Sequence, residues 1–180
     1  MHNYKYDLIK AEYDNFYRSL LAKGKLPMWS TKKGFWNASI SDEIFEAFKR
    51  LKLEKFKNFL NIGSGDGKVT LIASLFCKNA EGIEIDKNLH DKGLEMQRKL
   101  DIKNATLHNA DFFLHNFSKY DVLFVSPDVP FERGLEKKLL KEMKGKLIHY
   151  GHHFHPQNLM VTESLDINGT KVSLYSRKMP

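Results

Sequence analysis

The sequence feature that most constrains this chain is an apolar run that leads directly into a glycine-rich turn, at residues 59–67 (FLNIGSGDG). The run predicts a buried strand, and three glycines in five residues predict a strand-to-helix turn with positive φ angles and no Cβ between the backbone and a ligand. One helix length later, residues 81–85 predict a second strand, with Glu84 near its end. A carboxylate there can accept hydrogen bonds from ribose hydroxyls. The two segments together predict a nucleoside-cofactor site; an ordinary tight turn is the alternative, and it leaves Glu84 without a role.

The spacing of the glycines narrows the type of cofactor. Dinucleotide-binding folds use G-x-G-x-x-G, and nucleoside triphosphate-binding loops use G-x-x-x-x-G-K-[ST]. Gly63, Gly65 and Gly67 instead form G-x-G-x-G, in which the third glycine comes one residue early. The spacing therefore matches neither of these phosphate-binding motifs.

Length, charge and cysteine content limit the class of protein. A chain of 180 residues suits one domain and can bury roughly 70% of its unfolded surface. The single cysteine, Cys77, excludes an internal disulfide and indicates a reducing compartment. We expect a cytoplasmic protein with no membrane span, because no signal-peptide pattern and no long apolar run is present. The formal charge of +7 favours an acidic partner, either RNA or an acidic protein surface. The oligomeric state is left open.

Strand and helix patterns alternate after residue 57, which predicts an α/β fold with a doubly wound, mostly parallel sheet. Asn168 and Gly169 between two further strand patterns form the strongest short-range hairpin signal. The chain should thus end in an antiparallel hairpin that completes a seven-stranded sheet. The expected strands are residues 59–62, 81–85, 105–109, 122–126, 146–150, 159–165 and 171–176, and the expected helices are residues 68–76, 88–100 and 132–143.

Residues 1–56 are expected to form a helical extension and loop that pack on the core of residues 57–180, within one structural domain. Apolar residues at helical spacing predict a helix over residues 9–20, and Ser41 is the expected N-cap of a helix that ends near residue 53. Residues 25–40 show no period. In this loop the aromatic residues either attach the loop to the core or form a lid over a cofactor or substrate; they are Trp29, Phe35 and Trp36, interleaved with Lys25, Lys32 and Lys33.

The order of these motifs resembles class I S-adenosylmethionine-dependent methyltransferases. Within that class the chain resembles the small archaeal and mitochondrial protein-lysine methyltransferases, including those that act on ATP synthase subunit c. The resemblance implies a Rossmann-like sheet and methyl transfer from S-adenosylmethionine to a protein lysine. It extends from Asn61 to about Ser176, through residues 61–67, 82–84, 110–111, 120–129 and 135–143.

The resemblance also implies which residues hold S-adenosylmethionine. Glu84 would bind the ribose hydroxyls, whereas Asp86 is placed to cap the next helix. Asp111 would accept a hydrogen bond from the adenine amine, with a role as a turn or cap residue as the alternative. Asn61 stands where the family has Asp or Glu, so a catalytically inactive cofactor-binding module is one reading of the chain. The cofactor residues that the resemblance implies are Gly63, Gly65, Gly67, Glu84 and Asp111, and Asn61, Ser64 and Phe112 are further candidates beside them.

The segment at residues 126–130 (SPDVP) should lie beside the methyl acceptor. Its prolines fix the backbone and withhold N–H donors, which leaves carbonyls and the Asp128 carboxylate to orient an amine. Pro127 and Asp128 are therefore the candidate catalytic residues, with a helix cap as the alternative role for Asp128. Trp29, Phe35 and Trp36 are the candidate substrate residues, because aromatic faces can hold a methylated cation. RNA is the second candidate substrate, on the basis of the positive charge and the basic, aromatic loop.

A cluster of histidines near residue 150 raises the question of a metal site. We expect none, since no cysteine lies nearby, the cluster straddles a strand end and a loop, and methyl transfer needs no metal. A neutral imidazole near the acceptor is the role left open. The histidines are His149, His152, His153 and His155.

Overall fold

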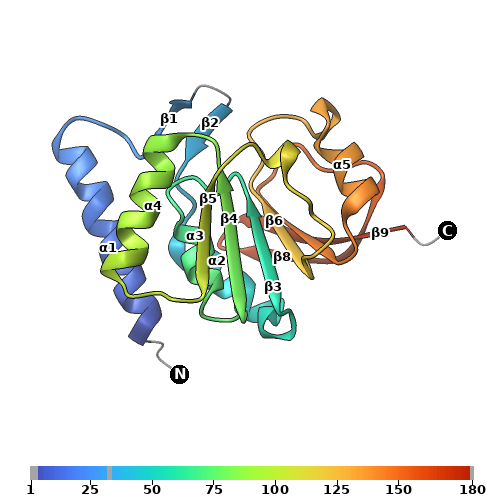
Figure 1. Ribbon diagram of the computed structural model, residues 1–180, viewed down its shortest axis with the longest axis horizontal. Helices are drawn as coiled ribbons and strands as arrows, with labels where there is room; N and C mark the ends of the chain where they lie inside the picture. Colours follow the sequence, from blue (N-terminus) through green and yellow to red (C-terminus); the bar gives the residue numbers. More distant parts are fainter. Residues whose placement is uncertain (1–3, 32–33, 179–180) are drawn as a thin grey trace.

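The computed structural model describes residues 4–31 and 34–178 and has a doubly wound α/β architecture (Figure 1). Its main sheet has seven strands in the order β5-β4-β3-β6-β7-β9-β8, of which β3 to β7 are parallel and β9 is antiparallel to both of its neighbours. The predicted fold class is thereby confirmed. The strands are β3 (Asn58–Ile62), β4 (Asn79–Glu84), β5 (Ala105–Asn109), β6 (Val122–Val125), β7 (Lys146–Tyr150), β8 (Leu159–Ile167) and β9 (Thr170–Arg177).

Helices cover the two faces of this sheet unequally (Figure 1). One face carries four helices, α1 (Tyr4–Ala22), α2 (Ser41–Arg50), α3 (Lys68–Ala73) and α4 (Lys87–Lys99), whereas α5 (Leu135–Glu142) lies on the other. Each face has its own apolar cluster. On the four-helix face, Phe48 of α2 packs edge-on against Phe59 of β3 and Phe124 of β6. Strand β6 is buried along its whole length, as expected for a central parallel strand covered on both sides.

The segment between α1 and α2 differs from the expected loop. It forms a small antiparallel sheet of β1 (Met28–Thr31) and β2 (Gly34–Asn37), which lies at the edge of the main sheet where the parallel strands end (Figure 1). The aromatic residues of the segment are brought together because Trp29 and Trp36 are paired across this hairpin. Lys32 and Lys33, which the sequence interleaves with these aromatic residues, lie outside the described residues, as do residues 1–3.

Two expected helix starts are corrected. Ile40 is the N-cap of α2 and Ser41 is its first helical residue; the Ile40 backbone is already extended, and no side chain caps the helix. The helix expected over residues 132–143 is instead a short 3₁₀ turn, η3 (Phe131–Arg133), followed by α5. Gly134 separates them, because its φ of 115° cannot continue a helix.

Two further 3₁₀ turns are η1 (Leu53–Lys55) and η2 (Phe112–Leu114). Across the described residues, no helix combines the length and the apolar character needed to cross a bilayer.

Candidate functional site

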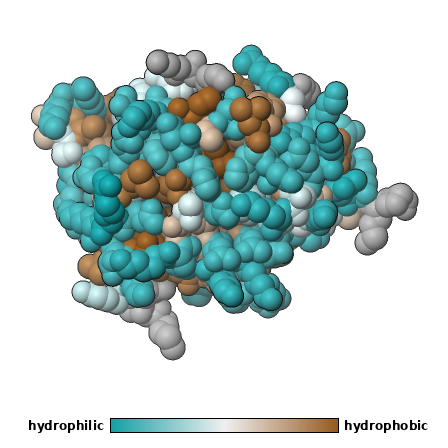
Figure 2. Space-filling model, in the orientation of Figure 1, coloured by the Kyte–Doolittle hydropathy of each residue, from teal (hydrophilic) through white to brown (hydrophobic). Residues whose placement is uncertain are grey.

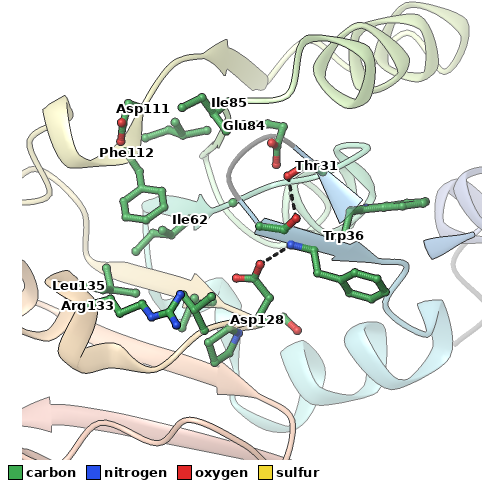
Figure 3. A pocket seen from close by; sticks show the side chains of 18 of the residues that line it. Thr31, Trp36, Ile62, Glu84, Ile85, Asp111, Phe112, Asp128, Arg133 and Leu135 are labelled. Atoms are coloured by element: carbon green, nitrogen blue, oxygen red, sulfur yellow. Dashed lines mark hydrogen bonds between the residues drawn. The ribbon is translucent and has the colours of Figure 1, made fainter. Parts of the chain in front are cut away.

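A cavity of about 320 Å³ lies at the carboxyl ends of β3, β4 and β6 (Figure 3). The chain leaves β3 towards β4 on one side and later returns to place β6 on the other side. Ligands of doubly wound sheets bind at such a reversal of strand order. A smaller cavity of about 210 Å³ adjoins the larger one; Gly63, Trp36 and Asp128 line both. The two cavities together can therefore hold one elongated ligand.

The glycine turn forms the wall between β3 and α3. Gly63 has a φ of 69°, and a Cβ at this position would meet open space on the cavity side. Gly65 has a φ of 54°, and a Cβ there would lie 2.4 Å from Nε1 of Trp36. Both residues need the left-handed backbone region that glycine adopts without strain. Gly63 in addition leaves room for a ligand, whereas Gly65 leaves room for Trp36. Gly67, the third glycine of the motif, is the N-cap of α3.

Glu84 lies at the end of β4 and lines the larger cavity. Its Oε2 accepts a hydrogen bond of 2.8 Å from the Gly65 N–H, and its Oε1 accepts one of 2.7 Å from the Asp86 N–H. A carboxylate offers roughly four acceptor positions, so positions remain for ligand hydroxyls. Burial raises the pKa of the Glu84 carboxyl, although the two N–H groups act in the opposite direction. Asp86 caps α4 through the N–H groups of Asn88 and Leu89, as expected.

Asn61 and Ser64 line the smaller cavity rather than the larger one. Both are buried, and Nδ2 of Asn61 lies 3.4 Å from Oγ1 of Thr70, which is a long hydrogen bond. Ser64 is held by its N–H, which donates to the Ile83 carbonyl at 2.8 Å. The two residues thus lie together on the wall of the smaller cavity.

Asp111 and Phe112 follow β5 and line the larger cavity on the side opposite Thr31 and Trp36 (Figure 3). Oδ1 of Asp111 accepts a hydrogen bond of 2.9 Å from the Phe113 N–H and begins the 3₁₀ turn η2. Asp111 is therefore the N-cap of η2, which was its alternative role, and it also lines the larger cavity.

Pro127 and Asp128 lie in the turn after β6 and line both cavities. Oδ2 of Asp128 accepts a hydrogen bond of 2.5 Å from the Phe35 N–H in the hairpin (Figure 3). The contact is close, since a Cβ on Gly34 would lie 2.3 Å from the same oxygen. Pro130 is the N-cap of η3, so the helix-cap alternative for Asp128 is wrong. Asp128 instead joins the hairpin to the sheet.

The three aromatic residues of the hairpin have different positions. Phe35 lines both cavities and remains 46% exposed. Trp36 is buried; its ring lies 6.4 Å from that of Tyr17 in α1 and 4.3 Å from that of Trp29, centroid to centroid. Figure 3 shows its side chain directed away from Asp111 and Phe112. The hairpin therefore both attaches to the core and covers the cavities, and its part in substrate binding stays a prediction.

A buried charged cluster behind the glycine turn was not predicted from the sequence. Lys68, the first residue of α3, and Asp66 are both buried and both line the smaller cavity. The Tyr17 hydroxyl donates to Oδ2 of Asp66 at 2.5 Å, and the Tyr13 hydroxyl donates to the Asp66 carbonyl at 2.7 Å. The only signal in the sequence is the spacing of Asp66 and Lys68 around Gly67. Their burial depends on α1, which the sequence alone could not place.

The histidine cluster lies beyond the described walls of the two cavities. His149 is fully buried on β7, with its ring 4.4 Å from that of His155 and 6.0 Å from that of Phe131, centroid to centroid. Its Nε2 lies 3.0 Å from the His153 carbonyl, while Nδ1 has no hydrogen-bond partner in the part of the chain that the structure describes. Burial lowers the pKa of His149 to about 4. The imidazole is thus neutral at pH 7 and belongs to the core beside the turn that carries Asp128.

Comparisons with known proteins identify the fold. No protein-family model matches the chain, and no curated protein sequence matches it. Among solved structures, an RNA methyltransferase from Salinibacter ruber in complex with S-adenosyl-L-homocysteine is 16% identical, with a TM-score of 0.69 over 80% of this chain and 97% of that one. The putative methyltransferase yhhF from Escherichia coli is 22% identical, with a TM-score of 0.60 over 79% and 89% of the two chains. The N-methyltransferase NodS from Bradyrhizobium japonicum WM9 is 15% identical, with a TM-score of 0.61 over 74% and 94%. These likenesses establish a shared Rossmann-like fold.

Proposed function

We propose that the chain binds S-adenosylmethionine and transfers its methyl group to lysine side chains of proteins. The observation that carries the proposal is the convergence of the glycine turn, Glu84 and Asp128 on one pair of adjoining cavities at the reversal of strand order. Three structures that share the fold are described as methyltransferases, and the Salinibacter ruber one is in complex with S-adenosyl-L-homocysteine.

The residues on the cavity walls fit the cofactor. The open space at Gly63 gives room for the ligand backbone, and the remaining acceptor positions of Glu84 suit the ribose hydroxyls. Asp111 and Phe112 offer a carboxylate and a ring for the adenine base. Asn61 offers an uncharged amide to the amino group from the smaller cavity. When bound, the cofactor supplies a methyl group on a positively charged sulfur.

The chain's own contribution to the reaction is alignment of the acceptor. A lysine amine must lose a proton before it reacts, which costs about 4 to 5 kcal/mol at pH 7. An apolar wall lowers this cost because it disfavours the ammonium, and Phe35 and Phe112 supply such a wall. Asp128 would accept the proton that the lysine ammonium loses and pass it to water, so that the neutral amine can form the new N–C bond. The bound cofactor would supply the methyl group, and its sulfur would keep the electron pair of the broken C–S bond. Accurate positioning accounts for most of the rate enhancement in such a displacement.

Charge and apolar surface favour a lysine acceptor over RNA. Among the described residues, three carboxylates line the larger cavity, those of Glu84, Asp111 and Asp128, against one cation, that of Arg133. They attract an ammonium and repel phosphate. Figure 2 shows hydrophobic residues gathered at the top of the molecule, where Figure 1 places the hairpin and the segment after β5; Phe35 and Phe113 are exposed there. RNA methylation is the second candidate, supported by the formal charge of +7.

Transfer of radiolabelled methyl groups to a cell extract tests the proposal. We expect label in a fraction that resists nuclease and is lost with protease, and methyl-lysine after hydrolysis. The Glu84→Ala variant, which we expect not to bind S-adenosylmethionine, serves as the negative control. Label that is lost with nuclease would favour RNA, and calorimetric binding of S-adenosylmethionine without any transfer would favour an inactive binding module.

A further inference from the structure

Lys68 places an ammonium inside the smaller cavity. The side chain is 2% exposed although the residue begins α3, and it lines the cavity together with Asn61 and Gly63. The Nζ donates a hydrogen bond to the Ser39 carbonyl, and it lies 4.6 Å from the centroid of the Tyr17 ring. An ammonium at this depth is rare in proteins and needs partners of opposite charge or with hydrogen-bond acceptors.

The described residues meet this need only in part. An ammonium has three donors, and the hydrogen bond to Ser39 uses one of them. Asp66, the carboxylate whose charge acts most strongly on Lys68, directs its two oxygens to the Tyr17 hydroxyl and to the main-chain N–H of Lys68; within the described chain it forms no direct ion pair with Nζ. Burial lowers the pKa of Lys68 and raises the pKa of Asp66. The wall of the smaller cavity therefore carries a cation with donors to spare.

We propose that Lys68 binds the α-carboxylate at the amino-acid end of S-adenosylmethionine. The inference rests on the proposed function. The two cavities meet at Gly63, Trp36 and Asp128, so a ligand whose ribose lies at Glu84 extends past this junction into the smaller cavity. The sulfur and its methyl group then lie near Asp128, and the amino acid lies between Asn61 and Lys68.

The same placement gives a reason for Asn61. The resemblance described above leads to an acid at this position, which would pair with the amino group of the cofactor. Asn61 contributes no charge, whereas Lys68 contributes a charge to the lining of the same cavity. Recognition of the amino-acid end thus moves from its ammonium to its carboxylate.

A ligand that lacks only the carboxylate separates this binding role from a structural one. Lys68 also anchors the segment after β2 through Ser39, so its loss could disturb the whole site. A disturbance of that kind would weaken binding of all ligands by a similar factor, whereas loss of a carboxylate contact weakens only ligands that carry the carboxylate. Decarboxylated S-adenosylmethionine retains the nucleoside, the sulfonium and the amino group and is the suitable probe.

The test is a comparison by calorimetry of S-adenosylmethionine with its decarboxylated form, on the wild type, Lys68→Met and Lys68→Arg. We expect the wild type to prefer S-adenosylmethionine by about 10- to 100-fold, which is the range for a hydrogen bond to a charged group. Lys68→Met should lose this preference with its affinity for the decarboxylated form kept, and Lys68→Arg should retain part of it. Lys87→Met is the matched control, since Lys87, the first residue of α4, is exposed, pairs with Asp91 and is not among the described residues that line either cavity.

The wild type alone distinguishes failure of the proposed function from failure of the role of Lys68. If it binds neither ligand, the proposed function is wrong. If it binds both ligands with equal affinity, the role of Lys68 is wrong and the proposed function stands. In a folded Lys68→Met variant, an equal loss of affinity for both ligands would assign Lys68 a structural role and overturn the inference.

Discussion

The main-chain N–H of Phe35 donates a hydrogen bond of 2.5 Å to Oδ2 of Asp128, although the two residues are 93 positions apart in the sequence. The bond joins the hairpin of β1 and β2 to the turn that follows β6. Oδ1 of Asp128 has no hydrogen-bond partner among the described residues, and in the proposed reaction it is the oxygen that would contact the acceptor amine. We therefore propose two roles for this carboxylate, to hold the hairpin over the cavities and to contact the reacting group.

Two substitutions separate these roles of Asp128. Asp128→Asn keeps an oxygen for the Phe35 N–H but loses the charge, whereas Asp128→Ala loses both. We expect turnover to fall about 10-fold in the asparagine variant and about 100-fold or more in the alanine variant, with the affinity for S-adenosylmethionine within about threefold of wild type, because the cofactor contacts lie elsewhere. Steady-state kinetics and calorimetry measure the two effects. A loss of cofactor affinity as large as the loss of turnover would contradict this division.

Gly63 and Gly65 form a matched pair of variants with opposite expectations. Gly63→Ala introduces a methyl group into open space on the cavity side, and Gly65→Ala introduces one 2.4 Å from Nε1 of Trp36. In both variants, backbone strain at positive φ destabilises the fold by about 1 kcal/mol. We expect Gly63→Ala to lose only about that much stability while its cofactor affinity falls at least tenfold. Gly65→Ala should lose more stability because Trp36 must move. Chemical denaturation and calorimetry check both; equal unfolding free energies in the two variants would show that the Trp36 contact is unimportant.

The central elements of the sheet were predictable because their signals are local. Strands β5 and β7 begin and end at the residues that the sequence indicates, and β7 lies between two glycines, Gly145 and Gly151, that mark its ends. Asn168 and Gly169 predicted the terminal hairpin for a similar reason, as both adopt the positive φ that its turn requires. Glu84 and Asp111 reach the cavity because parallel strands end at the same edge of the sheet.

The parts of the site that the sequence did not predict depend on contacts between distant segments. Strands β1 and β2 have four residues each, too few for a period to be visible. The bond from Phe35 to Asp128 and the burial of Lys68 require the hairpin and α1 to be placed against the glycine turn. No local pattern encodes these placements, and a lysine in the first turn of a helix is ordinarily exposed.

Acidification should weaken cofactor binding through Glu84. Burial raises the pKa of this carboxyl, and a protonated carboxyl loses acceptor positions for the ribose hydroxyls. The affinity for S-adenosylmethionine is thus complete above the raised pKa and falls as the pH drops through it. We expect Glu84→Gln to bind about 10- to 100-fold more weakly at pH 7.5 and to show a flatter pH dependence. Calorimetry between pH 5 and 8 measures both; a variant as pH-dependent as the wild type would assign the titration to another group.

Acidification should also destabilise the fold through His149, whose pKa is lowered to about 4 from an ordinary value of 6.5. Between these two values the unfolded chain binds the additional proton and the folded chain does not, so the free energy of unfolding is complete above pH 6.5 and decreases as the pH falls towards 4. The full contribution is about 3 kcal/mol. His149→Phe, which retains a ring against Phe131 and Tyr175, should show a smaller decrease in denaturation experiments across this range. Parallel curves for wild type and His149→Phe would show that the acid sensitivity arises elsewhere, in His90 or His155, whose pKa values burial also lowers.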